Sequence, residues 1–320
     1  MPSHDPARPG ALPLRPLTTG ELLDAAVVLV RAQAGRLFAL GAVVALAEQV
    51  ALFWLRRYCD VDASFLPADD KLGPFGYLVV LSFFTEMLAI AVLGGTAAAR
   101  APRVLLGSSA PAAAAVLART ARRPIVPGQG RAVPMVLAGL LAAAIGCTCA
   151  WAFVVFPVPL QVLGLVLALM LTVLCWVVLY GLLGLVAPAV VIDGYGPFGA
   201  LVRTLRLSSR GFFRVGWIRI LGYFSWLIVR LALAEAVVGV VTLAYASPSS
   251  TVDRYLMGSV WLVVNALAYP ILGCLDVALH LESRMRTEGL DIALTVSLRR
   301  NTAGAPAPLN PSPATVARLP

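Results

Sequence analysis

The sequence predicts an all-α protein, a polytopic transmembrane helical bundle with six spans plus short amphipathic interfacial helices on the cytoplasmic side. Apolar residues make up 60% of the 320 residues and charged residues only 13%, against about 25% charged residues in a typical soluble domain. The apolar residues gather in stretches long enough to cross a bilayer, since about 20 helical residues cover its roughly 30 Å core. These stretches lie at about 37–55, 75–99, 132–156, 160–187, 216–246 and 256–281.

The basic residues are distributed unevenly between the connections. The net charge is +9. Most Arg residues precede the first span, lie between spans two and three or four and five, or follow span six, whereas the opposite connections are rich in Asp. Positively charged connections stay cytoplasmic, so we expect both termini inside a bacterial inner (plasma) membrane. Topology therefore explains the basic charge, and we expect no nucleic acid partner.

The chain is expected to fold as one membrane domain between two polar ends. Residues 1–18 are rich in Pro and predict a disordered cytoplasmic head, with prolines where a signal peptide would carry its apolar run. Residues 19–295 form the predicted membrane domain, and 296–320 a disordered cytoplasmic tail. Thr19 is the expected N-cap of the first helix.

A short amphipathic segment precedes each odd-numbered span. The segments begin near Thr19, Ala110 and Phe198, and the last sets Phe198, Leu201, Val202 and Leu205 against an Arg stripe. Helices of this kind lie in the headgroup layer with Arg reaching toward anionic lipid. We therefore expect the bilayer, with anionic headgroups at the cytoplasmic Arg clusters, to be a partner.

Spans three and four are predicted to form a close hairpin. Pro157-Val158-Pro159 leaves almost no connection between them. Small residues recur at every fourth position of both spans, and small residues let membrane helices approach closely. The residues of this stripe are Ala138, Ala142, Gly146 and Ala150 in one span and Gly164, Ala168 and Thr172 in the other.

Ionisable residues inside membrane spans are costly and are therefore candidate functional groups. The predicted intramembrane polar cluster consists of Glu48, Glu86, Arg230, Glu235, Asn265 and Asp276. Glu48, Glu86, Arg230 and Glu235 fall at similar depth, so we expect Arg230 to pair with Glu86 or Glu48 and at least one carboxyl to stay protonated. The cluster is interpreted either as a clamp that fixes helix packing or as a proton- or substrate-lined cavity.

Two features of the last span modify this picture. Asp276 lies only one to two turns from the cytoplasmic end, where a boundary role is expected. Pro270 is predicted to kink the span and free the carbonyl of Ala266. Asn265 is expected to bond into that gap.

Searches for catalytic motifs find none. The sequence has no His-Glu-x-x-His pair, no phosphate-binding Gly-rich loop with Lys and no Gly-x-Ser-x-Gly elbow. Its Cys residues are interpreted as small packing residues. We therefore expect a protein that is not an enzyme and that carries no cofactor and no metal.

Two cytoplasmic stretches resemble a known bacterial family. They are Leu14-Arg15-Pro16-Leu17-Thr18-Thr19-Gly20-Glu21-Leu22-Leu23-Asp24-Ala25-Ala26 and Leu281-Glu282-Ser283-Arg284-Met285-Arg286-Thr287-Glu288-Gly289-Leu290-Asp291-Ile292. With six spans they resemble the family named after the membrane domain of glycerophosphoryl diester phosphodiesterases, as a stand-alone member without the catalytic domain. The resemblance implies a membrane location and six helices, and it carries over no catalytic residue.

The two end motifs are rich in charge and are expected to meet on the cytoplasmic side. A contact from Glu21 or Asp24 to Arg284 or Arg286 would close the bundle there. The leading functional prediction is a non-catalytic scaffold or accessory subunit of a membrane complex, with a membrane protein as partner. The alternative is a transporter or permease-like protein that uses the midplane Glu and Arg residues.

Overall fold

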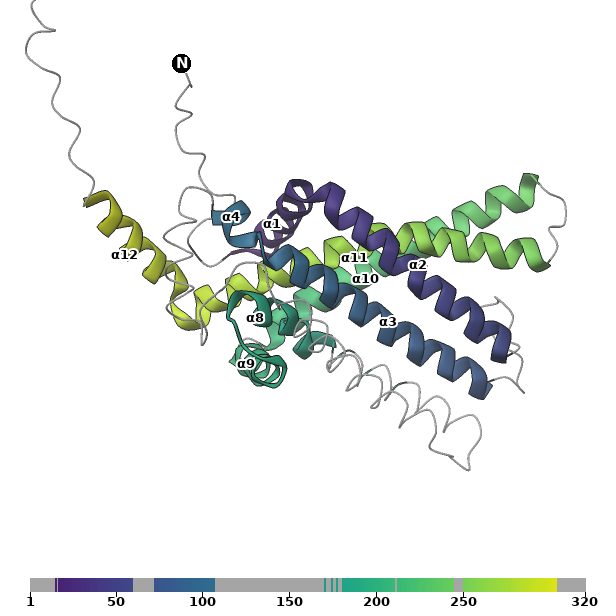
Figure 1. Ribbon diagram of the computed structural model, residues 1–320, viewed down its shortest axis with the longest axis horizontal. Coiled ribbons are helices and arrows are strands. Elements are labelled where there is room, and N and C mark those ends of the chain that lie inside the picture. Colours follow the sequence, from purple (N-terminus) through teal and green to yellow (C-terminus); the bar gives the residue numbers. More distant parts are fainter. Residues whose placement is uncertain are drawn as a thin grey trace, which may run out of the picture.

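The computed structural model describes residues 15, 17–59, 72–106, 170, 174, 177, 180–210, 212–244 and 250–303 (Figure 1). Every regular element within these ranges is an α-helix, which confirms the predicted fold class for this part of the chain. The helices are α1 (Thr19–Ala32), α2 (Ala34–Cys59), α3 (Leu72–Ala98), α4 (Ala101–Leu106), α8 (Val186–Ile192), α9 (Pro197–Arg210), α10 (Phe212–Ala244), α11 (Ser250–Glu288) and α12 (Leu290–Ala303).

Four of these helices contain segments long and apolar enough to cross a membrane. The segments are Ala34–Tyr58, Leu81–Ala98, Arg214–Val241 and Gly258–Glu288. They coincide with four of the predicted stretches, which identifies the chain as a membrane protein. The predicted span 132–156, most of 160–187 and the hairpin expected between them lie outside the described residues, as does the surface segment near Ala110.

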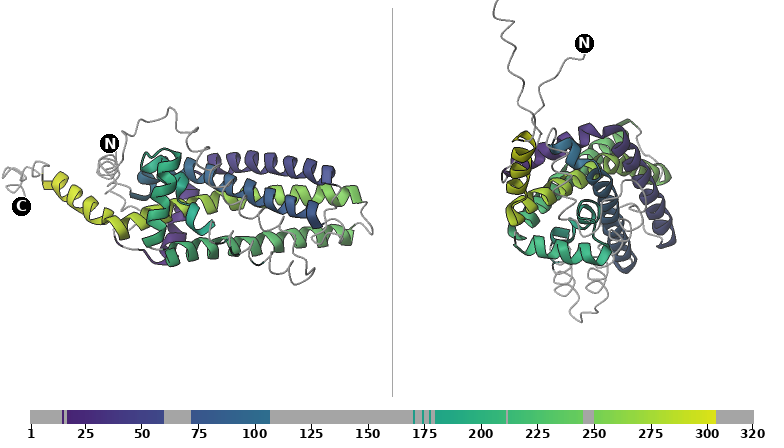
Figure 2. Two further views of the ribbon diagram at one scale, coloured as in Figure 1. Left: turned by 90° about the horizontal axis from the view of Figure 1, so that it is seen from below. Right: turned by 60° about the vertical axis from the view of Figure 1, so that its left-hand side comes forward.

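Helix α11 is the centre of the described bundle. It packs against α2, α3 and α10 along its length and against α1 near its C-terminal half. In its apolar segment 78% of the residues are buried, compared with 12% in α10. The short helices α1, α4, α8 and α9 gather at the end of the bundle where α11 continues toward α12 (Figures 1 and 2).

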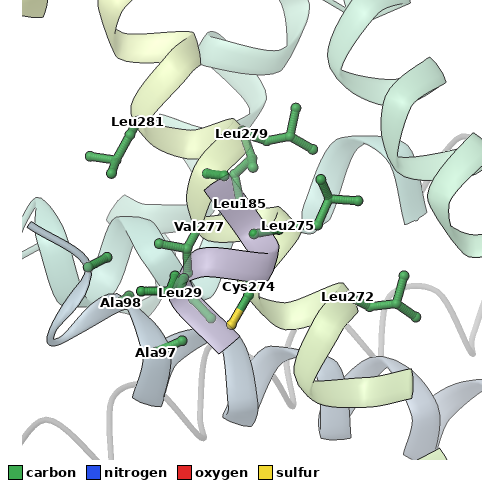
Figure 3. Close-up of a cluster of buried hydrophobic side chains, with 14 of the residues drawn as sticks. Leu29, Ala97, Ala98, Leu185, Leu272, Cys274, Leu275, Val277, Leu279 and Leu281 are labelled. Atoms are coloured by element: carbon green, nitrogen blue, oxygen red, sulfur yellow. The ribbon is translucent and has the colours of Figure 1, made fainter. Parts of the chain in front are cut away.

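A dense apolar core joins the long helices to these short ones. Figure 3 shows Leu29 of α1, Ala97 and Ala98 of α3, and Leu185 gathered around the α11 segment from Leu272 to Leu281. Cys274 lies in this core as a free, fully buried thiol, which is the packing role expected for it.

Helices α3 and α11 approach each other closely at a pair of glycines. A Cβ atom placed on Gly273 would lie 2.6 Å from the backbone nitrogen of Gly94 and 3.1 Å from the carbonyl oxygen of Ile90. Only glycine permits this backbone contact, because any side chain would clash. Lipid tails are as apolar as the helix surfaces, so close packing of this kind is what holds membrane helices together.

The first helix begins one residue earlier than predicted. The N-cap is Thr18, and its hydroxyl accepts from the Glu21 backbone N–H while the Glu21 carboxylate accepts from the Thr18 backbone N–H. This reciprocal arrangement is a capping box, and it replaces Thr19 as the predicted cap. Leu17 is only 1% exposed, so the end of the predicted disordered head is part of the folded core.

The C-terminal side also differs from the prediction. Helix α12 continues to Ala303, past residue 295, where the sequence analysis ended the membrane domain. Gly289 has φ 63° between α11 and α12, a left-handed conformation that ends a helix at little cost for glycine.

Pro270 lies inside α11 without ending the helix. The carbonyl oxygen of Ala266, which Pro270 deprives of its helical donor, faces α2, because a Cβ atom on Gly41 would lie 2.8 Å from it. Asn265 does not bond into this gap. Its side chain points to Glu48 and Arg230 instead, so that prediction was wrong.

Candidate functional site: a buried polar layer

Four long helices each contribute a polar side chain to one buried layer. Glu48 comes from α2, Glu86 from α3, Arg230 from α10 and Asn265 from α11, and each is at most 6% exposed. Helical periodicity explains the convergence, since each of these residues lies on the stripe of its helix that faces the bundle. The layer therefore ties all four described spans together.

The charged half of the layer is an ion pair. Arg230 Nη1 donates to Glu86 Oε1 at 2.5 Å. Of the two partners that the sequence left open for Arg230, the one that pairs with it is Glu86 and not Glu48. Tyr223 donates its hydroxyl to Glu86 Oε2 at 2.9 Å, and the Arg230 guanidinium lies 5.2 Å from the centre of the Tyr223 ring. Both oxygens of Glu86 are thus engaged.

The other half of the layer surrounds Glu48 with neutral groups. Glu48 Oε2 lies 2.6 Å from the Tyr269 hydroxyl and 3.3 Å from Asn265 Nδ2, and Oε1 lies 2.9 Å from Thr85 Oγ1. Asn265 Oδ1 in turn lies 3.4 Å from Arg230 Nη1 and links the two halves. No ion pair to Glu48 is formed by the described residues.

The hydroxyl of Thr85 can either donate a hydrogen bond to Glu48 or accept one from it. Its Oγ1 also lies 3.0 Å from the carbonyl oxygens of Leu81 and Ser82. A hydroxyl has one proton to donate and lone pairs to accept with. When that proton points to a carbonyl, Oγ1 can accept a proton from a neutral Glu48, so the subsite fits either state of the carboxyl.

Glu235 does not belong to this layer, and its predicted place there was wrong. It is exposed on α10. Five residues separate it from Arg230, which turns it about 140° around the helix axis. The same five residues also set Glu235 about 7.5 Å further along α10 than Arg230, so the two side chains differ in depth as well as in direction.

Asp276 forms a second buried pair, one that the sequence analysis missed. Arg219 donates from Nε and Nη2 to the two Asp276 oxygens at 2.5 and 2.9 Å, and both side chains are buried. The Arg219 guanidinium also lies 4.0 Å from the centre of the Tyr180 ring. Asp276 is therefore an interior residue and not the boundary residue expected from its position.

Gly184 makes room for this pair. A Cβ atom on Gly184 would lie 1.7 Å from Arg219 Cζ, so the guanidinium occupies the space of the missing side chain. A cavity of about 20 Å³ adjoins the pair and is lined by Met87, Ile90 and Ala187 among other residues. That volume holds about one water-sized group.

A network of charges closes the end of the bundle where the short helices gather. Asp193, which follows α8, lies 2.7 Å from Arg284 Nη1, 3.1 Å from Arg203 Nε and 3.4 Å from His280 Nε2. Glu288 bonds to both Arg203 and Arg284. Burial raises the pKa of Asp193, but His280, Arg284 and Arg203 outweigh burial and hold that pKa well below its ordinary value.

The two end motifs meet, although through other groups than those predicted. Glu21 bonds to Arg15 at 2.5 Å and caps α1, and Asp24 is exposed. Arg286 bonds to Glu282, and its Nη2 donates to the Leu17 carbonyl oxygen at 3.1 Å.

A second arginine reaches the same carbonyl. Arg214 Nη2 donates to the Leu17 oxygen at 2.5 Å. The N-terminal motif is therefore held through the backbone carbonyl of Leu17, which accepts from both Arg214 and Arg286. The expected ion pair from Glu21 or Asp24 to Arg284 or Arg286 is not formed.

Within the described ranges no group of three or more His, Cys, Asp or Glu side chains is arranged to hold a metal ion. Comparison of the chain with protein-family models, with curated proteins and with solved structures finds no match.

Proposed function

We propose that this chain is a non-catalytic scaffold or accessory subunit of a membrane complex in a bacterial inner membrane. In this proposal the chain crosses the membrane six times, keeps both termini in the cytoplasm and resembles the membrane domain of glycerophosphoryl diester phosphodiesterases. The four apolar helices and the family-like end motifs support the six-span arrangement, and the Arg-rich connections support its orientation.

One observation carries the functional proposal: the buried carboxyls Glu48, Glu86 and Asp276 are each engaged by side chains from other helices. Glu86 binds Arg230 and Tyr223, Glu48 contacts Thr85, Asn265 and Tyr269, and Asp276 binds Arg219. The cavity beside Arg219, at about 20 Å³, has room for a water-sized group but not for an organic solute. A layer of this kind favours fixed helix packing over passage of a substrate.

The surface of α9 supports a membrane-facing role for the short helices. This helix buries Ala200, Thr204, Leu207 and Ser208 against the bundle. It exposes Phe198 and Val202 by 73% and 57%, and Arg206 and Arg210 flank them. A helix that buries small residues and presents large apolar ones beside Arg is suited to the headgroup layer with anionic lipid.

The test is the size and transport activity of the intact protein. Membranes are solubilised in a mild detergent, and the mass of the particle is measured by native mass spectrometry. The same protein is reconstituted into liposomes that contain a pH-sensitive dye. The proposal predicts a particle heavier than one 33.7 kDa chain that contains a second protein, and no proton flux above that of empty liposomes. A single chain that conducts protons or solutes would contradict it.

A proton-coupled transporter is the second candidate, because the polar layer holds two carboxyls and one guanidinium. Neutrality requires a proton on one carboxyl, and the Thr85 hydroxyl fits Glu48 in both proton states. This candidate predicts flux that Glu48→Gln abolishes and that Asp24→Asn, an exposed carboxyl on α1, leaves unchanged. Flux that both variants retain would exclude Glu48 as the carrier.

A further inference from the structure

The exposed face of α10 carries a carboxyl inside the apolar segment of that helix. Glu235 lies inside the apolar segment Arg214–Val241, nine residues before the helix ends at Ala244. At 1.5 Å per residue it is about 13 Å from that end. An ionised carboxyl facing hydrocarbon costs several kcal/mol, and such residues are rare unless they face a partner.

Glu235 belongs to a regular stripe. The exposed residues preceding it recur at alternating spacings of four and three, and the stripe consists of Trp217, Leu221, Phe224, Ile228, Leu231 and Glu235. This is the spacing of the contact seam between two helices that pack side by side in a left-handed pair. The seam lies on the far side of α10 from Arg219, Tyr223 and Arg230, which face the bundle.

Helix α2 shows what a purely lipid-facing stripe looks like in the same chain. Its exposed large residues are Val43, Leu46, Val50 and Trp54, and no ionisable residue interrupts them. The α10 seam differs from this stripe by the one carboxyl, so its occupant must supply a positive charge or a hydrogen-bond donor.

Among the described residues, the two arginines buried within the apolar segment of α10 are not available to Glu235. Arg219 and Arg230 are both consumed by internal ion pairs. The sequence contains no Lys, Arg or His between Arg131 and Arg203, so neither that stretch nor a second copy of it brings a cation. A cation is the charge-complementary group for a carboxylate, and this favours a helix of a different protein as the occupant.

We propose that the α10 seam docks a transmembrane helix of another protein that carries Lys or Arg opposite Glu235. This inference rests on the proposed function, for which it names the surface of contact and the chemistry of the partner. The aromatic and aliphatic residues of the seam supply the packing, and the ion pair fixes the register of the two helices, as a buried polar residue does in paired helices.

Photo-crosslinking in native membranes tests the proposal. A benzophenone amino acid replaces Leu231, one turn from Glu235 on the seam, and in a matched control it replaces Val50 on α2. The proposal predicts an adduct from position 231 whose crosslinked peptide is a membrane helix of a different protein with Lys or Arg, and none from position 50. Glu235→Lys should reduce the adduct about tenfold, and Glu placed at the partner's basic position should restore it.

Adducts only within the chain or between two copies, an equal yield from position 50, or a yield that Glu235→Lys leaves unchanged would each overturn the inference. Glu235 is exposed, so Glu235→Lys should leave the fold of the bundle intact. The adduct yields of the variant and the unmodified protein can therefore be compared directly. If Glu235→Lys protein still elutes in the heavier native particle, the proposed subunit role stands and only the α10 seam is wrong. If no heavier particle exists in the unmodified protein, the subunit role itself fails.

Discussion

Arg219 illustrates how far the stability of this bundle depends on single buried side chains. It bonds to both oxygens of Asp276, lies over Tyr180 and occupies the space left by Gly184. Removal of one partner from such a buried pair leaves the other charge without compensation. Removal of both replaces the pair by apolar packing.

Arg219→Leu is therefore expected to lower the free energy of unfolding by about 3–5 kcal/mol. The double variant with Asp276→Leu should recover most of that loss, because no uncompensated charge remains. Chemical unfolding in detergent, followed by circular dichroism, measures both. A double variant no more stable than Arg219→Leu alone would contradict the ion pair described here.

Residue by residue, the sequence predicted some of these contacts and missed others for identifiable reasons. Counting depth along helices was enough to bring Arg230 and Glu86 to one level. Glu235 was placed with them although it lies about 7.5 Å further along α10 than Arg230 and on the opposite side of the helix. Arg219 was assigned to a cytoplasmic cluster because its neighbours in sequence are basic. The signal that was overlooked is that Arg219 and Asp276 lie at matching depths in consecutive spans.

At the level of elements, glycine pairs set the distance between helices. Gly273→Ala places a Cβ atom against the backbone of Gly94, which cannot move as a side chain would. We expect a loss of about 1–3 kcal/mol in unfolding free energy.

Gly258→Ala is the matched control on α11, because nothing lies within 4 Å of its Cβ position. It should gain about 0.5–1 kcal/mol from helix propensity. Thermal unfolding of the two variants in the same detergent makes the comparison. Equal effects would show that the close approach of α3 and α11 is not stabilising.

The charge network that joins α8, α9 and α11 predicts a pH dependence. Its centre is Asp193, whose pKa lies below its ordinary value. A carboxyl with a lowered folded-state pKa contributes its full stability above the unfolded-state pKa and loses it as pH falls toward the folded-state value. The stability difference between the wild type and Asp193→Asn should shrink as the pH falls below about 4.

Thermal unfolding of both proteins across this pH range gives the measurement. At pH 7 Asp193→Asn should be less stable by about 3–5 kcal/mol, since Arg284 loses a buried partner. A difference that grows as the pH falls below about 4 would have the wrong sign for this network and would exclude Asp193 as its centre.

The positions of the helices also differ in how well the local sequence predicts them. The long apolar runs predicted α2, α3, α10 and α11, because length and composition alone define a membrane-crossing helix. The burial of Leu17 depends on tertiary contacts with α10 and α11, whereas the Thr18 cap is a Thr-x-x-Glu capping box that the local sequence contains. Composition therefore placed these four helices correctly and their polar flanks less well.

On the scale of the whole molecule, the two ends of the bundle are chemically different. The end with α1, α4, α8 and α9 holds the Asp193 network and the shared Leu17 carbonyl. The opposite end holds the last turn of α2, the C-terminal end of α10 and the first turn of α11 (Figure 1). The proposed membrane role requires that these ends lie on opposite sides of a bilayer, with the Arg-rich end in the cytoplasm.

Labelling of single cysteines with a membrane-impermeant maleimide tests this requirement most directly. In a background without the five native cysteines, Tyr58→Cys probes the far end of α2, and Ser209→Cys probes the exposed surface of α9. The account predicts that intact spheroplasts label position 58 alone and that inverted vesicles label position 209 alone. Labelling of position 209 from outside intact spheroplasts would contradict the orientation, and labelling of both positions from one side would contradict the membrane crossing itself.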